Sequence, residues 1–272
     1  MRAARLVSAL WLVVVAVFLY APLAVLVAFS FNDSRRDIVW RGFTLKYYAQ
    51  ALGDADLIAA FVNSLTIALA STLASLILGT LAAFWLWRFR FKGRAVAEAA
   101  LALPIAAPEI CMGVAMMMFF GRVLPWPAEA PWPLNLGAIA LSHITFAFSF
   151  VAVVVRARLG SFDSDLEAVA RDLGATTWRV FREILMPHLT PALVAGGLLA
   201  FTLSLDDFVI TFFTSGPDTV TFPVKVYSMV RFAVSPEINA ASTVLMALTL
   251  LLTALALRVQ GASARLVGAV GA

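Results

Sequence analysis

The amino-acid sequence predicts an all-α membrane protein with six transmembrane helices. Three observations support this fold class: the composition, the length of the apolar segments and the placement of the basic residues. Of the 272 residues, 62% are hydrophobic and only 13% are charged, and the mean hydropathy is +0.93. Soluble domains have about 45–50% apolar and about 25% charged residues. The composition is therefore that of a chain surrounded largely by lipid.

The apolar segments are long enough to cross a bilayer. A transmembrane helix needs about 20 mostly apolar residues. Six segments meet or approach this length, with approximate bounds 6–31, 57–87, 95–120, 136–155, 189–213 and 238–257. We therefore expect a single transmembrane domain over 1–272, in which the segment 158–187 connects the fourth span to the fifth.

The first apolar segment has a second interpretation, because Arg2 and Arg5 precede it as basic residues precede the core of a secretory signal peptide. The apolar run is about 25 residues long, whereas the hydrophobic region of a signal peptide has about 7–15. This length favours an uncleaved membrane span.

The basic residues are concentrated in alternate connections. Thirteen of the twenty Lys and Arg residues lie before the first span or after the second, fourth and sixth spans. On the opposite side, Asp residues offset several of the remaining seven. Cytoplasmic connections of membrane proteins carry an excess of Lys and Arg. We therefore expect both termini and the segment 158–187 in the cytoplasm, and we attribute the net charge of +4 to membrane topology rather than to a nucleic-acid-binding face.

Several kinds of chemistry lack their residues in this sequence. No Gly-x-x-x-x-Gly-Lys-Ser/Thr phosphate-binding loop occurs, so the standard site for ATP is missing. The single cysteine, Cys111, allows neither a disulfide nor a cysteine-based metal site. His143 and His188 stand alone and are expected to be structural. We therefore expect a chain that is not an enzyme and that has no metal or cofactor of its own.

The cytoplasmic segment 158–187 is predicted to form two short amphipathic helices. Ser164 followed by Glu167 fits a capping box, which predicts a helix start. Gly174 is placed to end this helix, because glycine readily adopts the left-handed conformation found after a helix C-terminus. One apolar stripe follows helical spacing, and it consists of Leu166, Val169, Ala170 and Leu173. The second helix is expected to end before Pro187, and its apolar face is formed by Phe181, Ile184 and Leu185.

An apolar stripe on a cytoplasmic hairpin needs a surface to cover it. One interpretation is a linker that packs on the membrane helices of this chain. The other is a hairpin that docks into a groove on a second protein.

The same segment resembles the signature loop of the binding-protein-dependent ABC importer permeases, whose pattern is Glu-Ala-Ala, three residues, Gly and an apolar run that closes on Leu-Pro. The residues that match are Ala170, Asp172, Leu173, Gly174, Phe181, Ile184 and Pro187. The departures are Ala168 at the glutamate, Val169 at the first alanine and Met186 before the proline. Glu167 lies one place before the expected glutamate. The resemblance implies that this loop is the coupling helix that sits in a cleft of the nucleotide-binding subunit.

Within that family, the chain resembles most the spermidine/putrescine importers, and specifically their C-type permease subunit. The residues that carry this resemblance are Ser-Leu-Asp-Asp-Phe-Val-Ile-Thr-Phe-Phe at 204–213 and Phe-Pro-Val-Lys-Val-Tyr-Ser-Met-Val-Arg at 222–231. The resemblance implies a bacterial inner-membrane protein that works by alternating access. It also implies its partners: two subunits that bind ATP and Mg, a second and different permease subunit, and a periplasmic or extracellular solute-binding protein.

Acidic residues inside predicted spans are the candidates for a substrate path. Asp206 and Asp207 lie in the fifth span before Phe208, and Glu109 follows Pro108 in the third. A carboxylate at the bilayer centre costs about 2.5–3.5 kcal/mol, so such residues usually face a cavity or a partner charge. Anionic groups in a passage of low dielectric attract a cation such as a polyamine. The alternative for the two Asp residues is a structural role as a helix cap or charge partner near the membrane boundary, and the alternative for Glu109 is a partner of a helix terminus near a break.

Adjacent positions in a helix differ by about 100°. Both Asp206 and Asp207 can therefore face one polar interior only if that interior is wide or the helix is interrupted. Pro104 and Pro108 in the third span are breakers of the kind that membrane helices tolerate beside a cavity or a neighbouring helix. They predict either an ordinary kink or a hinge beside a translocation path.

The external segments offer weaker signals. Trp126 and Trp132 lie in a proline-rich loop and are expected to anchor the chain at the membrane interface. The segment 214–237, which contains Tyr227, is predicted to hold a helix in the interface. We include Tyr227 and Phe208 with Asp206, Asp207 and Glu109 in the predicted substrate path.

Two other functional classes compete with an importer subunit. A secondary cation transporter could use the same three acids as ion or proton sites, but such proteins usually contain internal repeats, and none is found. An intramembrane enzyme would need a catalytic constellation that the sequence lacks. Within the importer class, the alternative substrates are other small cations, amino acids and ferric ions.

Overall fold

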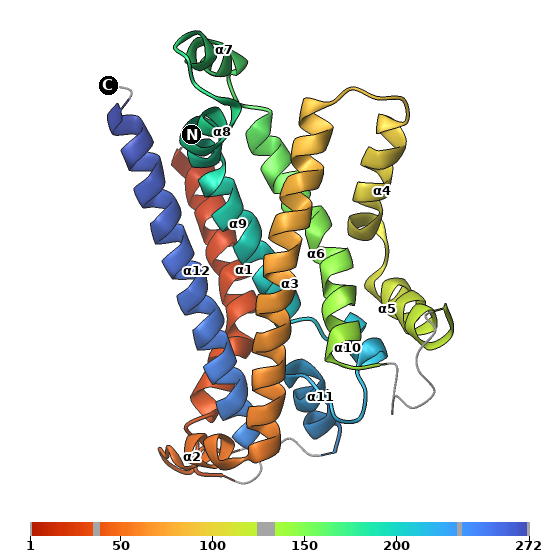
Figure 1. Ribbon diagram of the computed structural model, residues 1–272. Helices are drawn as coiled ribbons and strands as arrows, with labels where there is room; N and C mark the ends of the chain where they lie inside the picture. The colour runs from red at the N-terminus through yellow and green to blue at the C-terminus, as the bar shows by residue number, and fades with distance from the viewer. Residues whose placement is uncertain (1, 35–38, 124–133, 233–235, 271–272) are drawn as a thin grey trace. The chain divides into compact units, whose positions relative to one another are not determined.

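The computed structural model describes residues 2–34, 39–123, 134–232 and 236–270. Trp126 and Trp132 lie outside these ranges. The described chain is helical, and its only extended pairing is the isolated bridge between Asn32 and Phe43. The helices, in which η marks a π-helical turn, are α1 (Arg2–Phe29), α2 (Lys46–Gly53), α3 (Ala55–Arg88), α4 (Arg94–Ala106), α5 (Glu109–Met118), η1 (Phe119–Val123), α6 (Leu136–Leu159), α7 (Ser164–Asp172), α8 (Thr177–Val180), η2 (Phe181–Leu185), α9 (Met186–Leu205), α10 (Val209–Thr214), α11 (Phe222–Phe232) and α12 (Pro236–Val270) (Figure 1).

The chain divides into two compact units. The first comprises residues 1–59 and 225–250, and the second comprises residues 60–224 and 251–272. The second unit contains most of α3, together with α4 to α10, and it carries both the segment 158–187 and the acidic residues of the predicted path.

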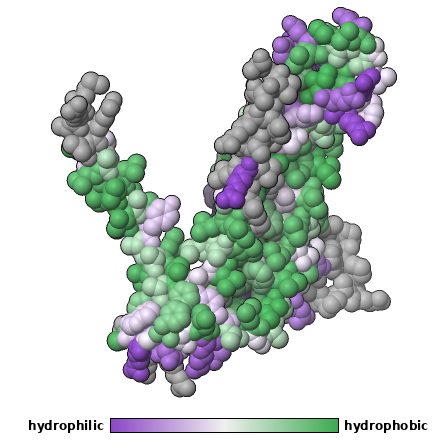
Figure 2. Space-filling model, turned by 90° about the vertical axis from the view of Figure 1, so that its left-hand side faces the viewer, coloured by the Kyte–Doolittle hydropathy of each residue, from purple (hydrophilic) through white to green (hydrophobic). Residues whose placement is uncertain are grey.

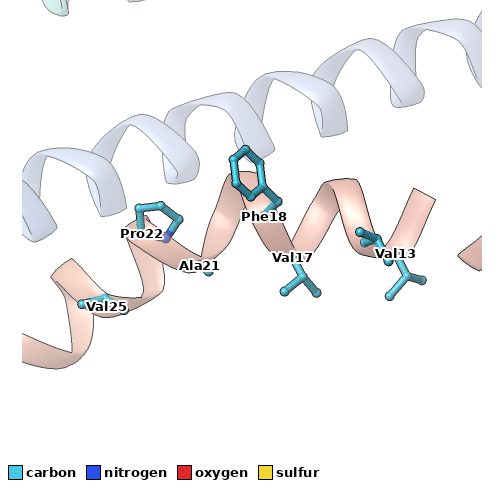
Figure 3. A pocket seen from close by; sticks show the side chains of 7 residues that line it. Val13, Val17, Phe18, Ala21, Pro22 and Val25 are labelled. Atoms are coloured by element: carbon cyan, nitrogen blue, oxygen red, sulfur yellow. The ribbon is translucent and has the colours of Figure 1, made fainter. Parts of the chain in front are cut away.

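In the first unit, α1 is apolar around its whole circumference. No residue in its most apolar window, within Val7–Phe29, is buried. A shallow groove on the helix is lined by apolar side chains of α1 itself, and Figure 3 shows Phe18 and Pro22 projecting to one side of the helix and Val17 to the other. A helix that is hydrophobic all round needs lipid or another protein around it, so α1 is suited to a membrane.

The core of the second unit lies where α6 packs against α9. Its buried residues are mostly small or β-branched, which lets helices approach closely in a membrane. They are Ala83, Ala147, Val151, Ala152, Val155, Leu159, Leu185, Leu189 and Ala200. Gly79 of α3 extends this close packing, since a Cβ atom there would lie 2.7 Å from the carbonyl oxygen of Phe148 and 2.8 Å from Cβ of Val151.

The long helices correspond to the predicted spans. Four helical stretches are long and apolar enough to cross a membrane, and their bounds are Val7–Phe29, Ala55–Arg88, Leu136–Leu159 and Thr177–Leu205. The helices α4 and α5 together form a further candidate, and the apolar stretch Pro236–Leu251 begins α12. Figure 2 shows hydrophobic side chains along the helices and hydrophilic ones gathered at their ends. The count of six crossings and the orientation of the termini stay predictions.

The predicted third span is broken as the prolines suggested, but at only one of them. The chain bends by 105° between α4 and α5. Pro108 is the residue just before α5, whereas Pro104 lies inside α4 and is buried there. Pro108 therefore ends the first segment, and Pro104 is accommodated within a continuous helix.

The prediction that the second cytoplasmic helix ends before Pro187 is wrong. The helical stretch Thr177–Leu205 continues through that proline into the fifth span. A π-helical turn, η2, comes directly before α9, and the N–H of Met186 donates to the carbonyl of Phe181 five residues earlier. Pro187 lies in the first turn of α9, where its missing N–H is tolerated.

Two basic connections that the sequence assigned to one side of the membrane meet in the second unit. Arg88 at the end of α3 pairs with Glu167 of α7 at 3.1 Å. Glu98 of α4 accepts from Arg94 at 2.9 Å and from Arg156 of α6 at 2.7 Å. The connection from α3 to α4 and the loop that carries α7 therefore lie at the same end of these helices (Figure 1).

The close approach of α3 to α6 generates a prediction. Gly79→Ala would force a backbone oxygen and a β-branched side chain apart, and we expect a loss of about 1–3 kcal/mol of unfolding free energy. Thermal unfolding of the purified protein in detergent measures this loss. Gly121→Ala is the matched control, because nothing lies within 4 Å of its added Cβ. Equal stability of the two variants would contradict the packing described.

Candidate functional site

The helix that leads to the acidic pair is interrupted at that pair. α9 ends at Leu205, and a new helix, α10, begins at Val209. The carboxylate of Asp207 satisfies the start of α10: its Oδ2 accepts from the backbone N–H of Thr211 at 2.8 Å and from the hydroxyl of Thr211 at 2.8 Å. A carboxylate at a helix N-terminus pairs with free N–H groups and with the positive end of the helix dipole. Asp207 is therefore a cap.

His143 of α6 holds this cap from the neighbouring helix. Its Nε2 lies 3.2 Å from Oδ2 of Asp207 and 3.0 Å from the hydroxyl of Thr211. Its Nδ1 lies 2.7 Å from the hydroxyl of Ser204, which in turn accepts from Ser71 of α3 at 2.9 Å. The imidazole is buried, and we call these five residues the His143 network.

The proton positions of the His143 network follow from its partners. An ionised carboxylate only accepts hydrogen bonds, so Nε2 of His143 carries the proton that faces Asp207. Nδ1 then accepts from the hydroxyl of Ser204, and the oxygen of Ser204 accepts from Ser71. Each member thus has a role that its chemistry permits, and α3, α6 and α9 are joined to the start of α10.

Adjacent acids consequently have different surroundings. The side chain of Asp207 is 8% exposed and paired, whereas Asp206 is exposed and its backbone N–H ends α9 by donating to Thr202 at 3.2 Å. The alternative of a structural role is correct for Asp207. Asp206 is the acid of the pair whose side chain lies exposed at the protein surface.

Glu109 lies in the first turn of α5, directly after the bend at Pro108, and is exposed. α5 packs against α10, where a Cβ atom on Gly113 would lie 2.7 Å from the ring of Phe213. Glu109 and Asp207 both lie near enough to Asp206 for their charges to act on it. The structure thus brings two exposed acids and one capping acid to neighbouring helix breaks. Among the residues that the structure describes, no three His, Cys, Asp or Glu side chains gather as metal ligands.

The structure places Phe208 and Tyr227, two further residues of the predicted path, in different units. Phe208 lies in the interruption itself, half-buried, with its ring centre 5.5 Å from that of Phe212. The predicted interfacial segment does contain a helix, α11. Tyr227 of α11 is exposed and belongs to the first unit, so it is described apart from the acids.

The hairpin formed by α7 and α8 has the predicted turn. α7 ends at Asp172, and Gly174 adopts a φ of 84°, which favours glycine. No residue of α7 is buried, and the side chain of Leu173 is 84% exposed. Leu166 and Val169 are exposed with it. The interpretation of a linker that packs its apolar stripe on the membrane helices is therefore wrong.

The predicted capping box is also wrong. The residue that caps α7 is Asp163, whose Oδ1 accepts from the N–H of Asp165 at 3.0 Å. Asp is as good a cap as Ser, and this frees Glu167 for other partners. Glu167 forms ion pairs with Arg88 at 3.1 Å and with Arg171 at 2.8 Å.

The other motif residues divide between two environments. Phe181 is half-buried and packs on the core cluster, with Ile184 half-buried beside it in η2. Ala168, Asp172 and Pro187 are exposed, and Ala170 is half-buried. The signature pattern therefore covers both the exposed turn of the hairpin and its packed base.

Sequence reasoning missed several functional candidates. Trp178 is exposed and stacks on Phe181 with ring centres 5.6 Å apart, so it extends the apolar surface of the hairpin. The sequence analysis did not single out Ser71, Ser204 and Thr211. Their hydroxyl groups, which stand in otherwise apolar helices, were the signal that could have indicated them. His143 was expected to be structural, and its position in the network confirms this.

The sequence of residues 75–268 matches the family model described as "Binding-protein-dependent transport system inner membrane component". The chain belongs to this family. It is 42% identical to the putrescine transport system permease protein PotI of Escherichia coli K12, over 84% of this chain and 82% of PotI. It is 37% identical to the spermidine/putrescine transport system permease protein PotC of the same strain, over 91% of each chain. The family resemblance drawn from the loop and from 204–231 is confirmed.

Solved structures of ABC transporters share the fold. A chain of the bacterial transporter involved in import of the acidic polysaccharide alginate aligns with a TM-score of 0.77 at 18% identity, covering 95% of this chain and 96% of that one. A chain of the MetNI methionine transporter in an inward-facing conformation aligns with a TM-score of 0.64 at 19% identity, covering 76% of this chain and 95% of that one. This inner membrane component therefore has the all-helical fold of an ABC permease subunit.

The His143 network generates a prediction about two buried serines. Ser204→Ala would leave Nδ1 of His143 without its partner and remove the bond from Ser71, and we expect a loss of about 1–3 kcal/mol of unfolding free energy. Ser149→Ala is the matched control in α6, because its buried hydroxyl has no partner among the described residues. Its removal should change stability by less than about 0.5 kcal/mol. Thermal unfolding in detergent compares them, and equal losses would argue against the network.

Proposed function

We propose that this permease subunit carries polyamines, putrescine or spermidine, into the cytoplasm. The observation that supports this most directly is the exposed carboxylate of Asp206 at a helix break, just before α10, which packs against α5 where the exposed Glu109 follows a second break. Putrescine and spermidine transport is named for relatives that are 42% and 37% identical over most of the chain. A polyamine carries ammonium groups at both ends, and anionic groups in a passage of low dielectric compensate for the water that it loses.

The acids of the path have separate roles in this proposal. Asp206 and Glu109 face the cation, and Phe208 lies beside them in the interruption. Asp207 does not contact substrate but fixes the break through Thr211 and His143. Tyr227 is assigned to the outer end of the path, on the predicted external segment.

The membrane topology of the proposal is six spans with both termini in the cytoplasm. The excess of Lys and Arg in alternate connections supports it. The meeting of Arg88 with Glu167, and of Arg156 with Glu98, supports the placement of two of those connections on one side.

The energy comes from separate subunits. Two ATP-binding subunits hold the ATP and Mg, and one of them docks on the exposed apolar stripe of α7 and on Trp178. Closure of these subunits on ATP moves both coupling hairpins, and the passage switches between inward and outward access because ATP and substrate each favour one state. The absence of a phosphate-binding loop in this sequence supports the assignment of hydrolysis to the partners.

The remaining partners are a second permease subunit and a solute-binding protein. The resemblance to the polyamine systems favours a different permease subunit rather than a second copy. A solute-binding protein fits the family description, and the alginate transporter has been solved in complex with an alginate-bound periplasmic protein.

Another small solute is the alternative within the same fold. A relative from Salmonella paratyphi A, a putative 2-aminoethylphosphonate transport system permease protein, is 29% identical over 87% of each chain. That solute also carries an ammonium group, so an exposed acid would suit it as well. Amino acids and ferric ions remain candidates of the same kind, and a secondary transporter is disfavoured by the family membership.

The separate roles of the two Asp residues generate a prediction. Asp206→Asn should lower uptake of labelled putrescine and spermidine at least about tenfold, which corresponds to about 1.4 kcal/mol, with normal assembly of the complex. Asp207→Asn should lower the amount of stable complex as well, because it weakens the cap of α10. Uptake is measured in cells that lack their own polyamine transporters and express this chain with its neighbouring operon.

Asp218→Asn is the control, since Asp218 is exposed in the connection after α10. Undiminished uptake by Asp206→Asn would remove that acid from the path. An assembled complex that hydrolyses ATP and takes up neither polyamine would remove the polyamine substrate and leave the importer.

The docking surface generates a second prediction. Leu173→Asp places a charge at the most exposed position of the apolar stripe, so the ATPase subunit should be lost on copurification while this chain stays folded. Thr177→Asp is the matched control, because it adds the same charge to an exposed site in the first turn of α8, where an acid is favourable. Retention of the ATPase by Leu173→Asp would show that the stripe is not the docking surface.

A further inference from the structure

The helix α7 presents two chemically different faces. Leu166, Val169 and Leu173 form one face, which is exposed. Glu167 leaves the helix on another side, and its side chain is 17% exposed. The first face is available to a partner, whereas the second is already occupied by residues of this chain.

The partner of Glu167 is the last residue of α3. Nη1 of Arg88 donates to Oε2 of Glu167 at 3.1 Å, and Nη2 donates to Oε1 at 3.1 Å. Two parallel bonds between guanidinium and carboxylate fix the relative direction of the groups as well as their distance. Arg171 donates to Oε1 at 2.8 Å from the next turn of α7 and holds the carboxylate in place.

Aromatic packing supports this ion pair. Trp87, which precedes Arg88, meets Phe162 edge to face with ring centres 5.9 Å apart. Phe162 in turn meets His188 of α9 at 5.2 Å. A small pocket between these residues and Glu167 is also lined by Phe181. The base of the hairpin is therefore fixed to the end of α3 by both charge and packing.

The same helix reaches the His143 network. α3 is one helix from Ala55 to Arg88 without a proline. Ser71 lies seventeen residues before Arg88, which is about 25 Å along a helix axis, and it donates to Ser204 next to the interruption. One rigid element thus has the coupling hairpin at its end and the helix break partway along it.

We propose that Glu167 and Arg88 form a latch that transmits displacement of α7 to α3, and through Ser71 to the break between α9 and α10. Glu167 is a positioning residue in this role, and it faces its own chain rather than the ATPase. The inference rests on the proposed function in one respect, because docking of an ATPase is what displaces α7.

The test uses the full complex, with its ATPase, partner permease and the solute-binding protein of the same operon, in liposomes. The variants are Glu167→Gln, Arg88→Gln and the exchange that combines Glu167→Arg with Arg88→Glu. Two quantities are measured: the stimulation of ATP hydrolysis by the loaded binding protein, and putrescine uptake per ATP hydrolysed. Mutations in a coupling network change such quantities by roughly twofold to thirtyfold.

We expect both single variants to keep the ATPase on copurification and to lose coupling by a factor in that range. The exchange should restore most of it, because the carboxylate introduced on α3 would then pair with the guanidinium introduced on α7 and with Arg171. The control should keep full coupling: Glu183→Gln removes the separate exposed pair with Arg179 and leaves every contact of Glu167 in place.

Three results would overturn the latch. Loss of the ATPase from Glu167→Gln but not from Arg88→Gln would assign Glu167 to the ATPase interface. Unchanged coupling in the single variants, or no restoration by the exchange, would reduce the pair to a surface contact. A wild-type complex that is stimulated by its binding protein but takes up no putrescine contradicts the proposed substrate alone, since stimulation still measures the latch.

Discussion

A helix that stops within a predicted membrane span leaves backbone N–H groups without partners, and hydrocarbon offers none. The structure meets this constraint at the start of α10 with the carboxylate of Asp207, which accepts from the backbone and the hydroxyl of Thr211. A buried carboxylate then needs its own compensation. His143 supplies it from α6, and Ser204 and Ser71 complete the set from α9 and α3. The interruption is therefore possible only because α3, α6 and α9 carry polar residues that lie within hydrogen-bond distance of one another.

That arrangement gives two adjacent acids opposite functions. The turn between α9 and α10 directs Asp207 into the protein and leaves Asp206 exposed at the end of α9. A continuous helix would have turned them by about 100° and hidden at least one from a narrow path. A second interruption lies nearby, the bend at Pro108 with Glu109 after it, so negative charge is concentrated at two neighbouring helix breaks. Discontinuous helices form substrate sites in many membrane transporters.

The sequence alone predicts part of the fold and of the candidate site, and it leaves the other part undetermined. Long apolar segments and Gly174 predict the helices and the sharp turn of the hairpin, because length and a left-handed glycine are local properties. The sequence allows either an interruption or a wide interior at Asp206, since Asp207 is held by His143, and His143 by Ser204 and Ser71, which lie far apart in the chain. The helix end before Pro187 was wrong because a π-helical turn absorbed the proline, and no local pattern signals such a turn. The prediction of a capping box was wrong because Asp163, and not Ser164, caps α7.

The departure of the loop from its family pattern has a physical consequence. Glu167 stands one residue before the expected glutamate, and one residue turns a side chain by about 100° around the helix axis. At its actual position, Glu167 reaches Arg88. At the expected position stands Ala168, which is exposed and small. Leu166, Val169 and Leu173 then form an exposed apolar face, while the ionic contact is kept within the chain. The hairpin thus separates its exposed apolar surface from the surface that holds α3, and each can change in sequence without disturbing the other.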